Sequence, residues 1–180
     1  MFSQLPEKYC LRDKMSHEVF LSLGSNLGLC SNNLQNAIAA ITEHEGLKMV
    51  RGSGIYETQP QDIAGQPWFC NQVILLDVRK FWTPWSLLAL LKDIEIRMGR
   101  TRTKCKGPRI IDLDILTYGN MIIDRDGLQI PHASMKKRAF VVVPMMDICP
   151  EYIFPNGESL RNVSDKLEFR LEQNRIYQNQ

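Results

Sequence analysis

Apolar and polar residues alternate along this chain with two different periods, and each change of period marks an expected strand or helix. Residues 19–23 are almost all apolar, which is typical of a buried strand. Leu34, Ile38 and Ile41 recur at helical spacing and predict a helix over residues 31–44. The same reasoning predicts, in chain order, strands at 47–57 and 70–79, a helix that Thr83 caps and Pro84 begins, and a strand around Asp112 and Asp114.

These elements follow one another as β-α-β-β-α-β, which predicts the fold class. The order favours an α+β, ferredoxin-like fold, with helices packed on an antiparallel sheet. A short strand near residues 121–123 is expected to pair with the strand of Asp112, and residues 132–149 to hold a loop, an apolar run and a short helix. We expect a loosely ordered N-terminal extension at 1–16, a single domain at 17–167 and a polar C-terminal tail at 168–180.

Composition narrows the class of protein. The 180 residues are 44% hydrophobic with a net charge of +2, which does not suggest a nucleic-acid or membrane partner. No run approaches the roughly 18 apolar residues that cross a membrane, and residues 1–16 lack the apolar segment of a secretory signal. The five cysteines are scattered without a C-x-x-C pair, so reduced thiols are expected rather than disulfides or a zinc site. A cytoplasmic protein is the expectation.

Two acids inside an apolar run form the most informative feature. Asp112 and Asp114 lie two residues apart, so a strand places both carboxylates on one face, while Leu113 and Ile115 turn toward the core. Neighbouring like charges repel each other, and acids are depleted from strands. A divalent cation would offset that repulsion, and Mg²⁺ characteristically takes one or two carboxylates together with substrate phosphates.

A run of cations without an acid precedes these carboxylates. Arginine suits phosphate through paired hydrogen bonds, and lysine supplies a mobile charge. A solvated surface run and a phosphate-binding loop are about equally supported by the residues alone. The run comprises Arg97, Arg100, Arg102, Lys104, Lys106 and Arg109.

Other local motifs are ambiguous by themselves. The turn Gly24-Ser-Asn-x-Gly28 can present backbone N–H groups to an anion, but an ordinary connecting turn is favoured. Phe69 and Asn71 can stack on and hydrogen-bond a flat heterocycle, yet a core ring beside a strand-end amide is the more common case. A lone histidine such as His132 is more often structural than catalytic. By themselves, Arg138 and Phe140 indicate a surface cation and a core ring.

Three motifs together resemble one family. They are Phe20-Leu-Ser-Leu-Gly-Ser-Asn-Leu-Gly28, Gly107-Pro-Arg-x-x-Asp-Leu-Asp-Ile115 and Ile130-Pro-His132, and they occur in the order and at separations similar to those of 6-hydroxymethyl-7,8-dihydropterin pyrophosphokinases of folate biosynthesis. The resemblance runs from about Val19 to Gly157 and makes residues 17–167 a pyrophosphokinase domain. It implies a monomeric enzyme that transfers pyrophosphate from ATP to the hydroxymethyl pterin, releases AMP and uses two Mg²⁺ ions.

The resemblance also assigns residues position by position. It implies that Asp112 and Asp114 bind the metal ions and that Arg100 and Arg102, in a mobile loop, take part in catalysis. The implied pterin-binding residues are Thr58, Phe69, Asn71, Asp112 and Phe140. The implied ATP-binding residues are Glu95, Arg100, Arg102, Arg109, Ile115, His132 and Arg138.

The chain departs from the family pattern at several positions. Cys105-Lys106 stands where an Arg-Trp pair is common, in a loop one residue shorter than in some members. Phe69 stands where some members have tyrosine, and Lys92 where some have glutamine. Two alternatives therefore stay open: an inactive nucleotide-binding homologue, and a metal-dependent phosphohydrolase that uses water as the nucleophile.

Overall fold

A computed structural model describes residues 15–60, 65–100, 107–125 and 127–178. Its elements in chain order are β1 (Ser16–Ser25), α1 (Cys30–Thr42), β2 (Leu47–Gly52), β3 (Tyr56–Thr58), β4 (Phe69–Arg79), α2 (Pro84–Arg97), β5 (Asp112–Tyr118), β6 (Ile123–Arg125), β7 (Leu128–Ile130), a single 3-10 turn (Met135–Lys137), α3 (Ala139–Ile148), α4 (Leu160–Asp165), β8 (Arg170–Glu172) and β9 (Arg175–Tyr177). The mixture of helices and a sheet confirms the α+β class.

One mixed sheet organises the molecule. Its strands follow the order β5-β1-β4-β3-β9-β8, and β2 also pairs with β4. The prediction of an antiparallel sheet is corrected at one pair, because β3 and β9 run parallel. The strand expected at 47–57 breaks into β2 and β3 around Gly52 to Gly54, and the chain's C-terminal segment adds β9 along β3.

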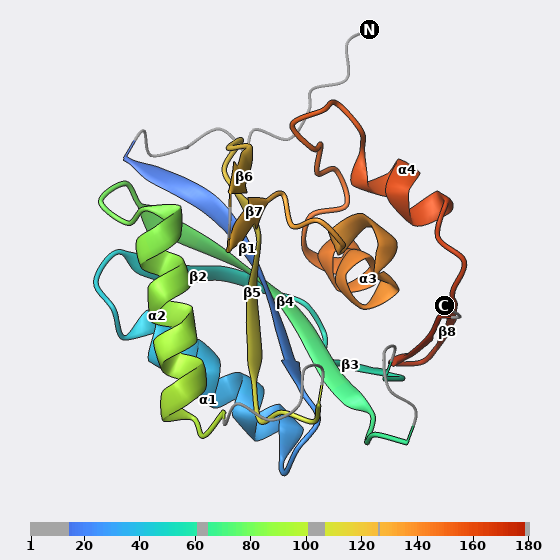
Figure 1. The fold of residues 1–180 in the computed structure, drawn as a ribbon. Coiled ribbons are helices and arrows are strands. Elements are labelled where there is room, and N and C mark those ends of the chain that lie inside the picture. The colour runs from blue at the N-terminus through green and yellow to red at the C-terminus, as the bar shows by residue number, and fades with distance from the viewer. Residues whose placement is uncertain (1–14, 61–64, 101–106, 126, 179–180) are drawn as a thin grey trace, which may run out of the picture.

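Helices cover both faces of this sheet. Figure 1 shows α1 and α2 on one side and α3 and α4 on the other. Alternation along β1 explains the two layers: Val19, Leu21 and Leu23 belong to the core under α1 and α2, whereas Phe20 belongs to the core under α3. The α2 cap matches the sequence prediction, since the Thr83 hydroxyl accepts a hydrogen bond from the Ser86 amide (3.1 Å) and Pro84 begins the helix.

The structure differs from the sequence predictions in two further places. The strand predicted near 121–123 begins at Ile123 and pairs with β7 rather than β5, because residues 123–130 form their own hairpin. Within the predicted polar tail, residues 170–177 form β8 and β9 and join the sheet. The domain boundaries themselves stay predictions, and the call on residues 1–16 falls almost wholly outside the described residues.

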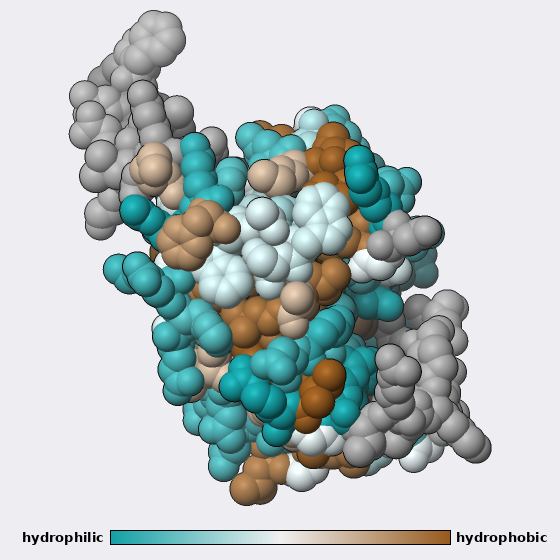
Figure 2. Space-filling model, turned by 60° about the vertical axis from the view of Figure 1, so that its left-hand side comes forward, coloured by the Kyte–Doolittle hydropathy of each residue, from teal (hydrophilic) through white to brown (hydrophobic). Residues whose placement is uncertain are grey.

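The surface mixes polar and apolar side chains. Figure 2 shows hydrophilic residues around most of one face, with pale and apolar surface between them. Among the described residues, no helix has the length and apolar character needed to span a bilayer.

Candidate active site

A row of paired residues crosses the sheet at the end of β1. Gly24 pairs with Asn71 of β4 on one side and with Asp112 of β5 on the other. Because paired residues share a face and strands lie about 4.8 Å apart, Asn71 and Asp112 stand on the same face roughly 10 Å from each other. Their face is the one that α3 covers farther along, at Phe20 and Val73. The pairing of the strands therefore places Asn71, a predicted pterin-binding residue, on the same face as Asp112, a predicted metal-binding residue.

Gly24 is needed for this row because of a close contact. A Cβ atom at Gly24 would lie only 2.9 Å from the Asn71 Oδ1 atom. Glycine at this position thus leaves room for the Asn71 side chain. The sequence showed Gly24 only as part of a turn motif, and the contact across the strands gives it a second role.

Asp112 is held between two arginines. Its Oδ1 atom accepts a hydrogen bond from Arg100 Nη1, and its Oδ2 atom accepts one from Arg109 Nη1, both at 2.7 Å. Burial opposes the charge on Arg100, but Asp112 and Glu95 outweigh it and raise the pKa of the guanidinium. The basic run is therefore more than a solvated surface patch, since two of its arginines meet the predicted metal-binding carboxylate.

Glu95 connects these arginines to the scaffold. Its Oε1 atom accepts hydrogen bonds from the Leu113 amide (2.7 Å) and from Lys92 Nζ (3.1 Å), and it forms an ion pair with Arg100. Burial raises the pKa of this carboxyl, and the two cations and the amide only partly oppose the effect. The side chain is only 3% exposed, so the structure shows it supporting Arg100. A direct contact with ATP stays a prediction.

Sequence reasoning missed Asn26, which fixes the backbone of Arg109. The Asn26 side-chain oxygen Oδ1 accepts a hydrogen bond from the backbone N–H of Arg109 (2.7 Å). The backbone N–H of Asn26 donates a second hydrogen bond to the Arg109 carbonyl (3.1 Å). Its Nδ2 atom also donates to Gln66 Oε1 (3.2 Å). A signal was present in the Gly24-Ser-Asn motif, but only the fold shows that this amide faces Arg109.

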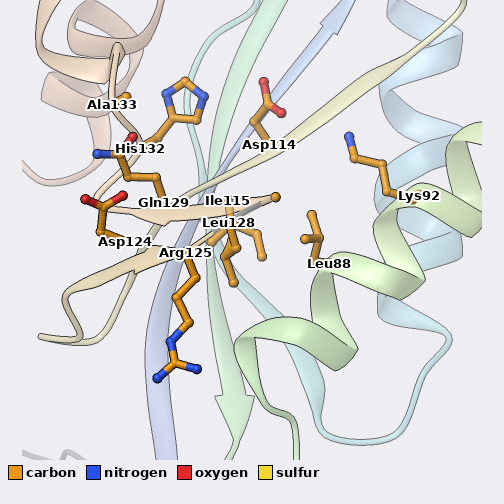
Figure 3. A pocket seen from close by; sticks show the side chains of 11 residues that line it. Leu88, Lys92, Asp114, Ile115, Asp124, Arg125, Leu128, Gln129, His132 and Ala133 are labelled. Atoms are coloured by element: carbon orange, nitrogen blue, oxygen red, sulfur yellow. The ribbon is translucent and has the colours of Figure 1, made fainter.

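A cavity of about 510 Å³ lies beside Asp114. Figure 3 shows the side chains around it, with Asp114 and His132 coming from different segments and Lys92 reaching in from α2. This volume falls within the range of small-molecule sites. Three predicted residues, Asp114, Ile115 and His132, line it together with Leu88, Lys92, Asp124, Arg125, Gly127, Leu128, Gln129 and Ala133.

His132 carries no proton on its Nδ1 atom in this arrangement. Nδ1 accepts a hydrogen bond from the Ser134 amide at 3.3 Å. Burial lowers the pKa of the imidazole below 6.5, and Arg138 lowers it further, although Asp114 and Asp112 oppose the shift. The ring is therefore neutral at pH 7, with Nε2 left as a hydrogen-bond donor.

A second pocket, of only about 10 Å³ in this structure, gathers some of the predicted pterin residues. Thr58 and Phe140 line it with Gln59, Ile176 and Gln178. Asn71 donates a hydrogen bond from Nδ2 to the Thr58 hydroxyl at 2.6 Å. Phe69 pairs with Thr58 across β3 and β4 but does not line this pocket. The structure thus brings Thr58, Asn71 and Phe140 together and leaves Phe69 beside them.

The remaining predicted residues have different outcomes. The Arg138 guanidinium lies over the Phe140 ring, 5.4 Å from its centroid. A predicted ATP-binding residue is therefore in contact with a predicted pterin-binding residue. Arg102 and the Cys105-Lys106 departure lie outside the described residues. The described cysteines Cys30, Cys70 and Cys149 form no disulfide in this structure, and reduced thiols stay a prediction.

The donor set suits magnesium. Asp112 and Asp114 offer hard carboxylate oxygens on one face of β5, and Asp114 also lines the larger cavity. Over the described parts of the chain, no group of three or more His, Cys, Asp or Glu side chains gathers to hold a metal ion. Two carboxylates without further protein ligands fit Mg²⁺, which completes its shell with water and phosphate oxygens.

Paired carboxylates, arginines and a cavity of nucleotide size are typical of metal-dependent phosphoryl-transfer enzymes. A family model described as 7,8-dihydro-6-hydroxymethylpterin-pyrophosphokinase matches residues 20–150. The chain therefore belongs to the 7,8-dihydro-6-hydroxymethylpterin-pyrophosphokinase family.

Curated relatives agree with this membership. The chain is 35% identical to a 2-amino-4-hydroxy-6-hydroxymethyldihydropteridine pyrophosphokinase of Methylorubrum extorquens, over 83% of this chain and 92% of the relative. A protein of the same name from Pseudomonas aeruginosa is 38% identical, over 81% of this chain and 89% of the relative. The folic acid synthesis protein fol1 of Schizosaccharomyces pombe is 36% identical over 82% of this chain, which spans only 20% of that longer protein.

A solved structure shares the fold. The crystal structure of wild-type HPPK-DHPS of Plasmodium falciparum with pteroate superposes with a TM-score of 0.65 at 17% identity. The match covers 89% of this chain and 47% of that one.

Proposed function

We propose that this protein transfers pyrophosphate from ATP to 6-hydroxymethyl-7,8-dihydropterin, giving AMP and the pterin diphosphate for folate synthesis. Family membership and the names of the relatives support this activity. The structural observation that supports it is the row Asp112–Gly24–Asn71, in which the proposed metal-binding carboxylate and the proposed pterin-binding amide share one face of the sheet. It is the reaction of a 2-amino-4-hydroxy-6-hydroxymethyldihydropteridine diphosphokinase.

Asp112 and Asp114 are the proposed ligands of two Mg²⁺ ions. When bound, the ions neutralise the phosphate charge that develops as one oxygen attacks and another leaves. Arg100 and Arg109 already neutralise Asp112 in this structure. We expect both arginines to turn toward the phosphates of ATP once a metal ion occupies the carboxylate, and Arg102 to join them.

The acceptor is recognised by shape and by hydrogen bonds. Phe69 and Phe140 are the proposed stacking rings, and Asn71 and Thr58 bind the heterocycle's polar edge. The hydroxymethyl oxygen then attacks the β-phosphorus, the bond from that phosphorus to the α-phosphate oxygen breaks, and AMP leaves as the hydroxyl proton passes to solvent. Positioning and charge neutralisation supply the catalysis, because phosphoryl transfer needs little covalent help from the protein.

The nucleotide is expected in the larger cavity. His132, neutral with a free Nε2–H, can donate to a phosphate, and Ile115 supplies an apolar wall. Glu95 and Arg138 complete the proposed ATP-binding set. A monomeric state and a cytoplasmic location stay predictions.

The identity of the released nucleotide tests the proposal. Purified protein is incubated with ATP and Mg²⁺, with and without the hydroxymethyl pterin, and the products are separated by anion-exchange chromatography. We expect AMP and pterin diphosphate in equal amounts, only when pterin is present. Release of ADP would indicate ordinary kinase chemistry, and pterin-independent phosphate would indicate a phosphohydrolase; either result would contradict the proposal.

A further inference from the structure

The C-terminal segment that forms β8 and β9 and ends at Gln178 contacts β3, the residue before β4 and the start of α3, and each of these places carries or adjoins a proposed pterin residue. It lies beyond residues 20–150, the part of the chain that matches the family model. Composition suggested only a polar tail at this position. Three separate contacts show instead that the hairpin is built into the wall of the smaller pocket.

The first contact joins β9 to β3. Ile176 pairs with Thr58, and the Glu57 amide donates a hydrogen bond to the Asn174 carbonyl at 2.8 Å. Ile176 is 2% exposed and packs with Ala139 of α3. The hairpin is therefore held by backbone hydrogen bonds and by an apolar side chain that also lines the pocket.

The second contact reaches the segment that leads into β4. The Tyr177 and Trp68 rings meet edge to face, with 5.4 Å between their centroids. The Arg175 guanidinium lies over the Trp68 ring at 5.5 Å. Trp68 directly precedes Phe69, so β9 supports the residue next to a proposed stacking ring.

The third contact caps helix α3. Gln178 Oε1 accepts a hydrogen bond from the Ala139 amide at 2.9 Å, and Gln178 Nε2 donates one to the Lys137 carbonyl at 2.8 Å. Arg138, which occupies the N-cap position, makes no side-chain capping bond. Gln178 thus supplies a cap from a distant part of the chain, immediately before Phe140.

We propose that residues Arg175 to Gln178 form a wall of the acceptor pocket and that Gln178 is a positioning residue, which caps α3 and so holds Phe140 against the pterin. This inference rests on the proposed function, since it concerns how that reaction's acceptor is held. Gln178 acts through Phe140 and Ala139, whereas the nucleotide cavity has its own lining residues.

The variant Gln178→Ala tests the role. Because loss of a helix cap weakens the local geometry by a modest amount, we expect a rise in the KM for pterin of about 5- to 10-fold. The KM for ATP should rise less than the KM for pterin, because Arg138, a proposed ATP-binding residue, lies between the two backbone groups that Gln178 binds but does not line the larger cavity. Gln178→Glu keeps an acceptor for the Ala139 amide but sets a carboxylate oxygen against the Lys137 carbonyl, so it should restore the pterin affinity only in part.

A matched control uses another glutamine. Gln35→Ala removes the same side chain from the exposed surface of α1 and should leave both KM values unchanged. An unchanged pterin KM in Gln178→Ala would overturn the inference, as would an equal rise in both KM values.

Hydrogen exchange separates this inference from the proposed function. The Ala139 amide should exchange faster in Gln178→Ala than in the wild type, and no substrate is needed for that measurement. Unchanged exchange would refute the cap. A wild-type protein that makes no pterin diphosphate would contradict the proposed function instead, while the exchange data would still decide whether Gln178 caps α3.

Discussion

Asp112 shows how much one residue depends on its neighbours. Its position in an apolar strand was enough to suggest a metal ion, because an isolated pair of acids there is unfavourable. The structure adds that Arg100 and Arg109 occupy both of its carboxylate oxygens. Residue types and spacing thus predicted the chemistry but not the pairing of these charges, which depends on how the end of α2 lies against the start of β5.

Replacing either acid should nearly abolish turnover. Asp112→Ala or Asp114→Ala removes a proposed metal ligand, and we expect kcat to fall on the order of 100-fold or more. The measurement is the rate of AMP formation at saturating ATP and pterin. Asp93→Ala, which removes an exposed carboxylate from α2, serves as the control and should keep wild-type kcat. Near-normal turnover in both site variants would refute the metal-binding role.

A single methyl group at Gly24 should disturb the acceptor site. In Gly24→Ala the new Cβ would lie 2.9 Å from Asn71 Oδ1, so the amide must shift. We expect the KM for pterin to rise about 5-fold, the cost of one weakened hydrogen bond. The control is Gly54→Ala, where the nearest atoms lie 3.7 Å from the added carbon. Equal pterin KM values for the two variants would show that the close contact has no role.

Elements differ in how well local sequence predicts them. The start of α2 was predicted from Thr83 and Pro84, since caps depend on neighbouring residues. The division of strand 47–57 and the addition of β9 were not predicted. Short strands such as β3 and β9 are stabilised by their partners rather than by their own residues, so local patterns carry little signal for them.

One ion cluster links two elements and gives a pH prediction. Glu158 accepts hydrogen bonds from Lys166, after α4 (2.8 Å), and from Lys136, in the 3-10 turn (2.9 Å). Hydrogen bonds from both lysines lower the pKa of Glu158 from 4.5 to about 2. A lowered folded-state pKa stabilises the protein above pH 4.5, and that contribution is lost as the pH falls toward 2.

Thermal unfolding of Glu158→Gln tests this cluster. The variant should have a lower Tm than the wild type near pH 6, and the difference should shrink as the pH falls from 4.5 toward 2. Arg161→Gln, which breaks an exposed ion pair between α4 and Glu151, is the control for surface charge. A difference in Tm that is independent of pH would contradict the assignment.

At the scale of the whole molecule, the sheet connects two sites. The larger cavity lies beside β5 and β7, and the smaller pocket lies among β3, β9 and the start of α3. Because the strands between the two sites belong to one hydrogen-bonded sheet, a ligand bound at either site stabilises that sheet. Ligand binding should therefore raise the free energy of unfolding of the whole domain.

Magnesium ATP should raise the melting temperature. A ligand present at 100 times its Kd adds about 2.7 kcal/mol to the free energy of unfolding, which corresponds to roughly 5 to 10 °C for a domain of this size. Differential scanning fluorimetry with ATP and Mg²⁺, compared with ATP and EDTA, measures the effect. We expect most of the shift to require the metal and to disappear in a variant that lacks Asp112 and Asp114. The same shift with EDTA would argue against a metal-bridged nucleotide.

The sequence by itself determined the α+β class, the Thr83 cap of α2, the faces of the main elements and the family, because periodicity and short motifs are local properties. Only the tertiary structure decided that Gly24 lies between Asn71 and Asp112, that Asn26 holds Arg109, and that Gln178 caps α3. These contacts join residues far apart in the chain. Their energies depend on strand register and on the path of the returning chain, and neither quantity is present in any local stretch of sequence.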